Sequence, residues 1–191
     1  MRFCFPRLRQ VSARPISICQ AALLVVPALL CACTGKDPYN PGTSLGTFTV
    51  EAQRKTATCG ELESPPDPWR FEVRLAQDGR TLYWLQGGLP VSGTLDDAQR
   101  TQMKSSDTKT VREATRGQAA CGVRREDQLD AALMAKEGAN GKLEVSSFVG
   151  TLRYRFVPTE GSDCQDVVAL GGYAELPCEV ALELRGSPKA K

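Results

Sequence analysis

Apolar and polar side chains alternate with a period of two along most of this chain, and this feature constrains the fold most. In "TFTVEAQ", Phe48, Val50 and Ala52 share one face. A half-buried β-strand shows this pattern because successive side chains point to opposite faces of a sheet. Further runs of this kind lie at 71–75, 81–86, 89–95, 145–156 and 179–185. Many short strands without strand–helix alternation predict an all-β fold, an antiparallel β-barrel or β-sandwich of about eight strands.

Two segments bear on how these strands connect. Asp78-Gly79 stands between two alternating runs, which is a strong signal for a tight β-hairpin. The segment 125–137 is ambiguous, since Leu129 and Leu133 fit both a helical stripe with Ala132 and a strand face with Ala131 and Ala135. We favour a strand because the neighbouring runs are strands, and a helix stays open as the alternative.

The N-terminus has the layout of an export signal. The first 20 residues contain four arginines and no acidic residue, and the apolar run "AALLVVPALLCAC" follows them. This run is shorter than the roughly 20 apolar residues that a membrane-spanning helix needs. We therefore expect it to direct export and not to remain as a transmembrane helix.

The end of this run, Leu30-Cys31-Ala32-Cys33, resembles the lipobox of bacterial lipoproteins. The resemblance implies cleavage before Cys33, a diacylglyceryl group on its thiol, and a fatty acyl chain such as palmitate on its new amino group. Two or three acyl chains give a stable membrane anchor. The implied location is the bacterial cell envelope, and the outer membrane is favoured because Thr34 stands where inner-membrane lipoproteins often carry Asp. An ordinary secretory signal with incidental cysteines is the alternative.

These features divide the chain into four parts. We predict a lipoprotein signal peptide at 1–32, a lipidated flexible tether at 33–46, a single β domain at 47–187 and a disordered tail at 188–191.

The whole chain has 24 Lys and Arg against 22 Asp and Glu, and four arginines leave with the signal. The mature chain is therefore slightly acidic, which excludes the basic footprint of a nucleic-acid-binding protein.

Four cysteines remain in the predicted domain: Cys59, Cys121, Cys164 and Cys178. An even number of cysteines in an exported chain predicts two disulfides. We favour Cys164 with Cys178, because only 13 residues lie between them, and hence Cys59 with Cys121. The other two connectivities stay open.

The C-terminal stretch carries a second resemblance. The elements Gly161–Cys164, Gly171–Tyr173 and Leu176–Cys178 resemble the ending of uncharacterised single-domain lipoproteins of myxobacterial type. The resemblance supports a disulfide and a β fold, and it implies no known activity. Gly171, Gly172 and Tyr173 form our candidate contact site, because paired glycines leave a neighbouring aromatic ring free to project. In the alternative, Tyr173 folds back to cap the sheet.

The composition excludes much catalytic chemistry. The chain contains no histidine, which removes Ser-His-Asp and Cys-His nucleophile arrangements and most catalytic zinc sites. Carboxylate pairs remain, namely Asp96 with Asp97 and Asp163 with Asp166, but neither pair matches a calcium-binding loop. We therefore expect no catalytic residues, no metal and no cofactor.

Four aromatic residues are the remaining candidates for a ligand site, because they can line a cavity in a barrel: Trp69, Tyr83, Trp84 and Tyr154. The expected function is a non-catalytic binding or interaction module whose partner is an unknown envelope protein or small ligand. One alternative is a lipocalin-like carrier of a small apolar ligand, which needs an apolar cavity of about 300 Å³ or more. The other is a carboxylate-dependent envelope hydrolase.

Overall fold

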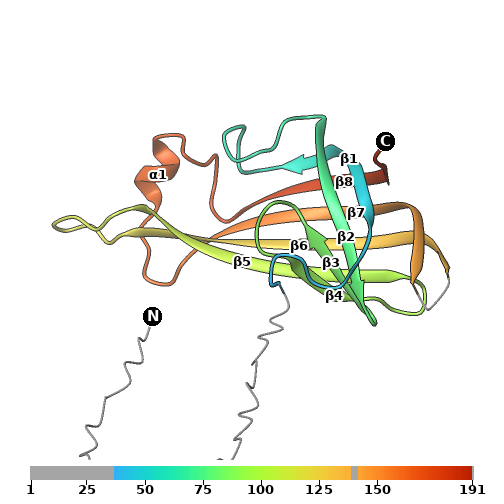
Figure 1. Ribbon diagram of the computed structural model, residues 1–191. Coiled ribbons are helices and arrows are strands. Elements are labelled where there is room, and N and C mark those ends of the chain that lie inside the picture. The colour runs from blue at the N-terminus through green and yellow to red at the C-terminus, as the bar shows by residue number, and fades with distance from the viewer. Residues whose placement is uncertain (1–36, 139–141, 191) are drawn as a thin grey trace, which may run out of the picture. The chain divides into compact units, whose positions relative to one another are not determined.

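The computed structural model describes residues 37–138 and 142–190, which form an all-β domain. Its elements are β1 (Thr43–Ala57), β2 (Trp69–Asp78), β3 (Thr81–Leu85), β4 (Val91–Thr94), β5 (Arg100–Arg112), β6 (Cys121–Glu137), β7 (Leu143–Pro158), α1 (Gln165–Ala169) and β8 (Cys178–Pro188). Every pair of neighbouring strands is antiparallel, in the order β4-β3-β2-β1-β8-β7-β6-β5. The sheet curls into a nearly closed barrel (Figure 1). The prediction of an antiparallel fold of eight strands is confirmed, and of the two predicted forms the barrel is the one found.

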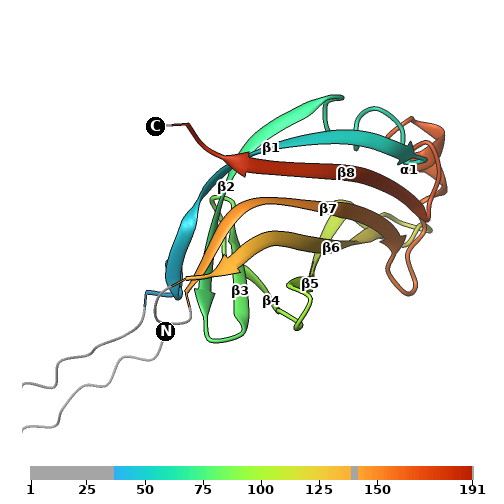
Figure 2. The ribbon, with the colours of Figure 1, turned by 90° about the vertical axis from the view of Figure 1, so that its right-hand side faces the viewer.

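The up-and-down order gives the barrel two different ends. The turn end carries the first residue of β1, the last residue of β8, the connections 79–80 and 95–99, and the adjoining ends of β6 and β7. The loop end carries the connections 58–68, 86–90, 113–120 and 159–177, and α1 lies in the last of these. Figure 2 shows α1 and the neighbouring loops at one side and the C-terminal end of β8 at the other. No helix in the described part of the chain is long and apolar enough to cross a membrane.

The barrel closes at a seam between β4 and β5, which pack together without a ladder. Gly93 of β4 makes this possible, since a Cβ there would lie 2.4 Å from the carbonyl oxygen of Gln102. Strand β4 has 4 residues whereas β5 has 13, so β5 continues well past its neighbour. The part of β5 from Lys104 to Val111 is exposed.

The inner faces of the strands fill the barrel with apolar side chains. Phe148 lies against Gly186, where a Cβ would come within 2.1 Å of the ring. Phe48 and Trp84 each contact the Phe148 ring edge-on, with centroids 5.6 Å apart, a favourable geometry for aromatic pairs. The least exposed large side chains are Phe48, Phe148, Leu75, Leu82, Met103, Leu182 and Leu184.

Several predicted boundaries differ from the structure. The segment 125–137 lies in β6, which confirms the prediction of a strand. Strand β1 begins at Thr43, within the predicted tether, and β8 continues to Pro188, within the predicted tail. Before β1, Asn40 accepts a hydrogen bond from Arg74, so this part of the predicted tether packs on the domain. The predicted signal peptide and the lipidation site Cys33 lie outside the described residues.

All four domain cysteines form disulfides, but the favoured connectivity is wrong. The bridges are Cys59–Cys178 and Cys121–Cys164, with sequence separations of 119 and 43. Cys59 follows β1 and Cys178 begins β8, and these strands are neighbours in the sheet. Strand pairing therefore decides the connectivity, and proximity in the sequence does not.

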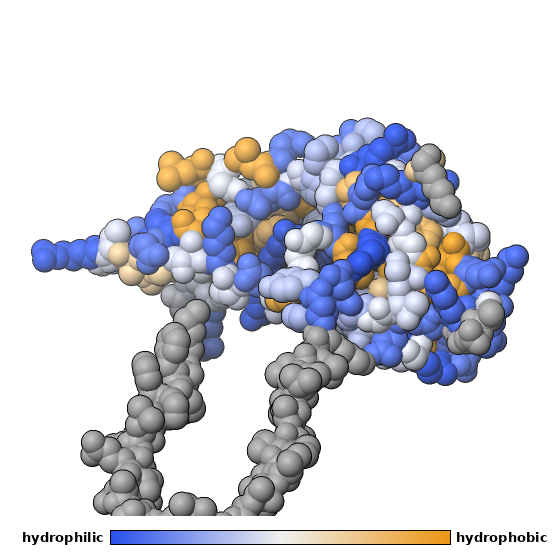
Figure 3. Space-filling model, in the orientation of Figure 1, coloured by the Kyte–Doolittle hydropathy of each residue, from blue (hydrophilic) through white to orange (hydrophobic). Residues whose placement is uncertain are grey.

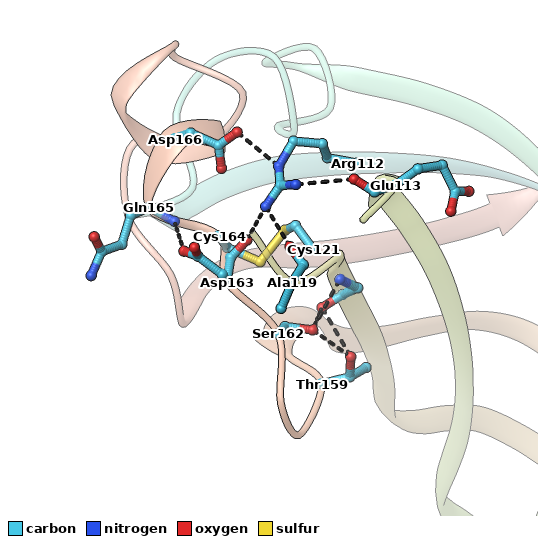
Figure 4. Close-up of a disulfide and its surroundings, with 11 residues drawn as sticks. Arg112, Glu113, Ala119, Cys121, Thr159, Ser162, Asp163, Cys164, Gln165 and Asp166 are labelled. Atoms are coloured by element: carbon cyan, nitrogen blue, oxygen red, sulfur yellow. Dashed lines mark hydrogen bonds and ion pairs between the residues drawn. A yellow bond between two sulfur atoms is a disulfide. The ribbon is translucent and has the colours of Figure 1, made fainter. Parts of the chain in front are cut away.

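A clasp around Arg112 holds α1 to the end of β5 (Figure 4). Its guanidinium donates hydrogen bonds to the carbonyl oxygens of Ala119 and Asp163, each at 2.7 Å, and its Nε lies 2.7 Å from Oδ2 of Asp166. The Cys121–Cys164 bridge joins the first residue of β6, which lies opposite Arg112 in the ladder, to the residue before α1. The long connection 159–177 is thus fixed to the barrel by a covalent bond and by charge-assisted hydrogen bonds.

Candidate functional site

A cavity of about 220 Å³ opens on the inner side of the barrel, between the 86–90 connection and strands β5, β6 and β7. It exists because β3 and β4 have 5 and 4 residues, whereas β5, β6 and β7 have 13, 17 and 16. The longer strands continue past the shorter ones and leave part of their inner face uncovered. The apolar part of the wall is formed by Trp84, Leu89, Val91, Met103, Leu129, Leu152 and Tyr154, and the polar part by Gln86, Ser105, Arg125 and Asp127.

Arg125 and Asp127 form the charged part of the wall. The Nε of Arg125 donates a hydrogen bond to Oδ1 of Asp127 at 2.7 Å. Burial lowers the pKa of Arg125, but the hydrogen bond and charge of Asp127 outweigh it, so the pKa is raised overall. The pair is electrically neutral as a unit, and the cavity therefore presents polar groups without a net charge.

Arg125 also lies over an aromatic surface. Its guanidinium carbon is 4.1 Å from the centroid of the Tyr154 ring and 6.0 Å from that of Phe156. Cation–π contacts of this kind favour a fixed position of the cation. Burial raises the pKa of Tyr154 to about 12, so its hydroxyl holds its proton more tightly than that of an exposed tyrosine.

The opposite wall comes from β3 and the connection that follows it. Trp84 is almost fully buried, and its Nε1 donates a hydrogen bond to Oε1 of Gln86 at 3.2 Å. Gly87 has a φ of +82°, a conformation that glycine adopts without strain, and it turns the chain over the cavity. Leu89 is 72% exposed although it lines the cavity, so an apolar side chain lies at the entrance.

A larger hollow of about 620 Å³ lies on the outer face of strands β5 to β8. Its charged side chains are largely paired, Arg153 with Glu179 at 3.3 Å and Arg155 with Glu126 at 3.8 Å. Such exposed pairs contribute little and are common on solvated strand faces. We therefore take the cavity on the inner side as the candidate site, because it combines an enclosed apolar wall with a few converging polar groups.

The structure places only part of the predicted aromatic set at this cavity. Trp84 and Tyr154 line it, whereas Trp69 and Tyr83 do not. Trp69 instead stacks near Phe71, with ring centroids 4.2 Å apart. The charged pair of the wall was not predicted. A signal existed in the sequence, because Arg125 and Asp127 have the same strand parity as the apolar Leu129.

The candidate contact site at Gly171, Gly172 and Tyr173 does not present a projecting ring. Tyr173 is 6% exposed and packs on Phe156, with centroids 5.6 Å apart, as the alternative interpretation predicted. Burial, followed by the charge of Glu63, raises the pKa of its hydroxyl. Gly172 packs against Val167, where a Cβ would lie 2.9 Å from Cγ1. Gly172 thus allows close packing of the chain on α1, whereas Gly171 adopts a φ of +81° with open space where a Cβ would lie.

The four candidate carboxylates lie at opposite ends of the barrel. Asp96 accepts a hydrogen bond from the backbone N–H of Arg100 at 2.8 Å, and Asp97 pairs with Arg80, both at the turn end. At the loop end, Asp163 accepts a hydrogen bond from the backbone N–H of Gln165 at 3.3 Å, and Asp166 pairs with Arg112. None of the four lines the cavity. In the described ranges, no group of three or more Cys, Asp or Glu side chains is placed to hold a metal ion.

A comparison of this chain with protein-family models, with curated proteins and with solved structures finds no match.

Proposed function

We propose that this chain is an envelope-anchored lipoprotein whose β domain is a non-catalytic module that binds another protein of the envelope. The cavity between the 86–90 connection and strands β5 to β7 is the observation that carries the proposal. One large apolar side chain of the partner enters this cavity, and the rim of the cavity at the 86–90 connection contacts the rest of the partner.

The size of the cavity favours a single side chain over a carried small molecule. Its volume of about 220 Å³ exceeds the roughly 150 Å³ of a cavity that binds benzene. It is smaller than the roughly 300 to 1,000 Å³ of pockets for drug-sized ligands. The remainder of the barrel interior is filled by Phe48, Phe148, Leu182 and their neighbours. A lipocalin-like carrier therefore has less support than a protein-binding module.

The chemistry of the wall favours the same conclusion. Binding energy in protein interfaces concentrates on a few side chains in well-packed pockets, and Trp, Tyr and Arg are the commonest of them. All three types line this cavity, as Trp84, Tyr154 and Arg125. A hydrolase has no comparable support, because the candidate carboxylates lie away from the cavity.

The position of the chain termini supports the proposed anchorage. The described chain enters β1 at Thr43, at the turn end, and the cavity belongs to the opposite half of the barrel. A chain lipidated at Cys33 would therefore join the domain at the turn end, at the opposite end from the 86–90 connection that borders the cavity. The anchorage is tested by mass spectrometry of the mature N-terminus, where we expect a triacylated Cys33. A soluble chain with an unmodified N-terminal residue would contradict it.

Site-specific photocrosslinking tests the binding function. We replace Leu89 by benzoylphenylalanine in the full chain and irradiate cells, with the same residue at Leu170 as the matched control. Both positions are exposed, at 72% and 86%, but only Leu89 lines the cavity. We expect one adduct from position 89 that is absent from position 170 and lost when Val91→Phe fills the cavity. No adduct from position 89, or an adduct that Val91→Phe leaves unchanged, contradicts the proposal.

A further inference from the structure

We propose that the free edge of β5 pairs with the same edge of a second copy of this chain, antiparallel, about a two-fold axis at Thr108. This inference concerns a different surface from the proposed binding cavity and does not depend on it. The partner copy brings its own Val111 opposite Ser105, a residue of the cavity wall. The second copy thus adds a side chain beside the entrance of the cavity.

The edge itself is the first observation. Strand β5 is last in the sheet order, and β6 is the strand with which it forms a ladder. Beyond β4, the run from Lys104 to Val111 is exposed without interruption. The β5–β6 hairpin extends past the barrel at the loop end (Figure 1). The outward N–H and C=O groups of such an edge form a template for another strand.

Two opposite charges on this edge have no partner within the described part of the chain. Asp107 lies opposite Arg125 of β6 and Lys109 lies opposite Val123, so both belong to the inner face. Neither Asp107 nor Lys109 makes an ion pair or side-chain hydrogen bond with a described residue. A charge on an edge strand normally opposes pairing with another chain. Here, among the symmetric registers centred on positions 107 to 109, the two charges oppose two and favour one.

Symmetry limits the registers that need comparison. A two-fold axis perpendicular to the sheet keeps the inner faces of both copies on the same side, so the two copies of one residue face each other across the axis. An axis at Asp107 places two aspartates opposite each other, and an axis at Lys109 places two lysines opposite each other. An axis at Thr108 places Asp107 of each copy opposite Lys109 of the other. Opposite charges directly across an antiparallel pair stabilise it, whereas like charges destabilise it.

The other pairs between positions 105 and 111 of this register carry no charge. Ser106 lies opposite Thr110, and both carry hydroxyl groups suited to a cross-strand hydrogen bond. The ladder ends naturally at the irregularity between Thr110 and Arg112, because a bulge interrupts regular pairing. Beyond the ladder, Arg112 lies opposite Lys104 of the other copy, and its charge is compensated by Asp166 of its own chain.

Other apolar surface at the loop end carries no comparable inference. Figure 3 shows apolar side chains projecting there, and Leu62 and Leu170 are 82% and 86% exposed. No charge pattern or neighbouring chain identifies what covers these leucines. The β5 edge differs because its own sequence specifies its complement.

Cysteine crosslinking in the full chain, produced in bacterial cells, tests the register. In the proposed dimer, the two residues at position 108 face each other at a Cα separation of about 4.5 or 5.5 Å, which a disulfide can bridge. Under mild oxidation we expect Thr108→Cys to give a disulfide-linked dimer on a non-reducing gel. Lys104→Cys is the matched control, because the two copies of position 104 lie eight residues apart along the strands, about 26 Å. The unsubstituted chain reports any crosslinking through the native cysteines.

Charge reversal in the Thr108→Cys chain tests the reason for the register. Asp107→Lys or Lys109→Asp alone should reduce the crosslinked dimer at least tenfold, and the two together should restore it. Val91→Phe, which fills the cavity, should leave the crosslink intact, so failure of the proposed function and failure of this dimer are distinguishable. The dimer is contradicted by equal crosslinking at positions 104 and 108, by a crosslink to a different protein, by no crosslink at 108, or by a double reversal that fails to restore it.

Discussion

The turn end and the loop end of this barrel are held together by different interactions. At the turn end, short connections bond to their neighbours through local hydrogen bonds, such as that from the N–H of Gln99 to the carbonyl of Asp96 at 3.0 Å. At the loop end, long connections are joined by Cys59–Cys178 and Cys121–Cys164 and by the Arg112 clasp. The difference shows that tight turns close one end, whereas long-range links at the other leave room for loops that can carry a binding site.

Removal of a disulfide should have the largest effect on stability, and the contacts that it breaks all lie at the loop end. Replacing Cys59 and Cys178 together by Ala should lower the free energy of unfolding by roughly 2 to 5 kcal/mol. Replacing Cys121 and Cys164 should lower the free energy of unfolding somewhat less. The stabilisation by a disulfide grows with the length of the loop that it closes, and the sequence separation is 43 for this bridge and 119 for the other. Urea unfolding followed by circular dichroism measures both. A loss below about 1 kcal/mol for either pair would show that the loops hold together without the bridges.

A substitution that creates a clash in the filled part of the barrel should give the second largest loss of stability. Gly186→Ala would place a Cβ 2.1 Å from the Phe148 ring, so we expect a loss of about 3 kcal/mol, the upper part of the usual range for overpacking. Gly88→Ala is the control, since a Cβ there meets no atom within 4 Å and its φ is not positive. It should change stability by less than about 0.5 kcal/mol. Equal effects of the two substitutions would contradict the packing described for the barrel interior.

Alkaline pH should destabilise the domain through the tyrosine of the cavity wall. The pKa of Tyr154 is raised to about 12 in the folded chain, against about 10 in an unfolded one. The folded state therefore holds the proton more tightly, so the stabilisation is complete below pH 10 and declines as the pH rises towards 12. The decline should reach about 2 to 3 kcal/mol. Urea unfolding at several pH values measures this decline, and Tyr154→Phe should abolish most of it. An unchanged pH dependence in that variant would show that another group causes the decline.

The smallest effect is expected at the exposed leucines of the loop end. Leu170→Ser should change the free energy of unfolding by less than about 0.5 kcal/mol, because the side chain is 86% exposed. Leu133→Ser, at 5% exposed, is the buried counterpart and should cost several times more. Thermal unfolding of the two variants measures the contrast. A loss above about 1 kcal/mol for Leu170→Ser would show that the residue packs in solution.

The strands could be predicted from the sequence because each depends on a local pattern. Phe48, Val50 and Ala52 alternate along one strand, and Asp78-Gly79 marks a hairpin that forms between residues adjacent in the chain. The disulfide connectivity could not be predicted in this way. Cys59 meets Cys178 because β1 pairs with β8, a contact between the two ends of the domain that no local pattern reports.

The candidate site could be predicted only in part for the same reason. The aromatic residues Trp84 and Tyr154 were identified by type, but the cavity depends on the unequal lengths of strands that meet across the seam. Tyr173 was placed beside two glycines, which indicate an unusual backbone without indicating where the ring packs. The alternation of side chains along β6 does indicate one further residue of the site, because Arg125 lies on the same face of the strand as the buried Leu129.

The central claim is that the cavity at the short β3–β4 hairpin is open and accepts an aromatic side chain. Binding of toluene, which mimics the side chain of phenylalanine, tests this claim most directly. In the full chain with Trp69→Phe, Trp84 is the remaining tryptophan and lines the cavity. We expect toluene to change Trp84 fluorescence saturably and to raise the unfolding temperature, since a ligand that binds the folded state stabilises it. Both effects should disappear when Val91→Phe is added. No saturable change in fluorescence, or the same change in the chain with the filled cavity, would contradict the claim.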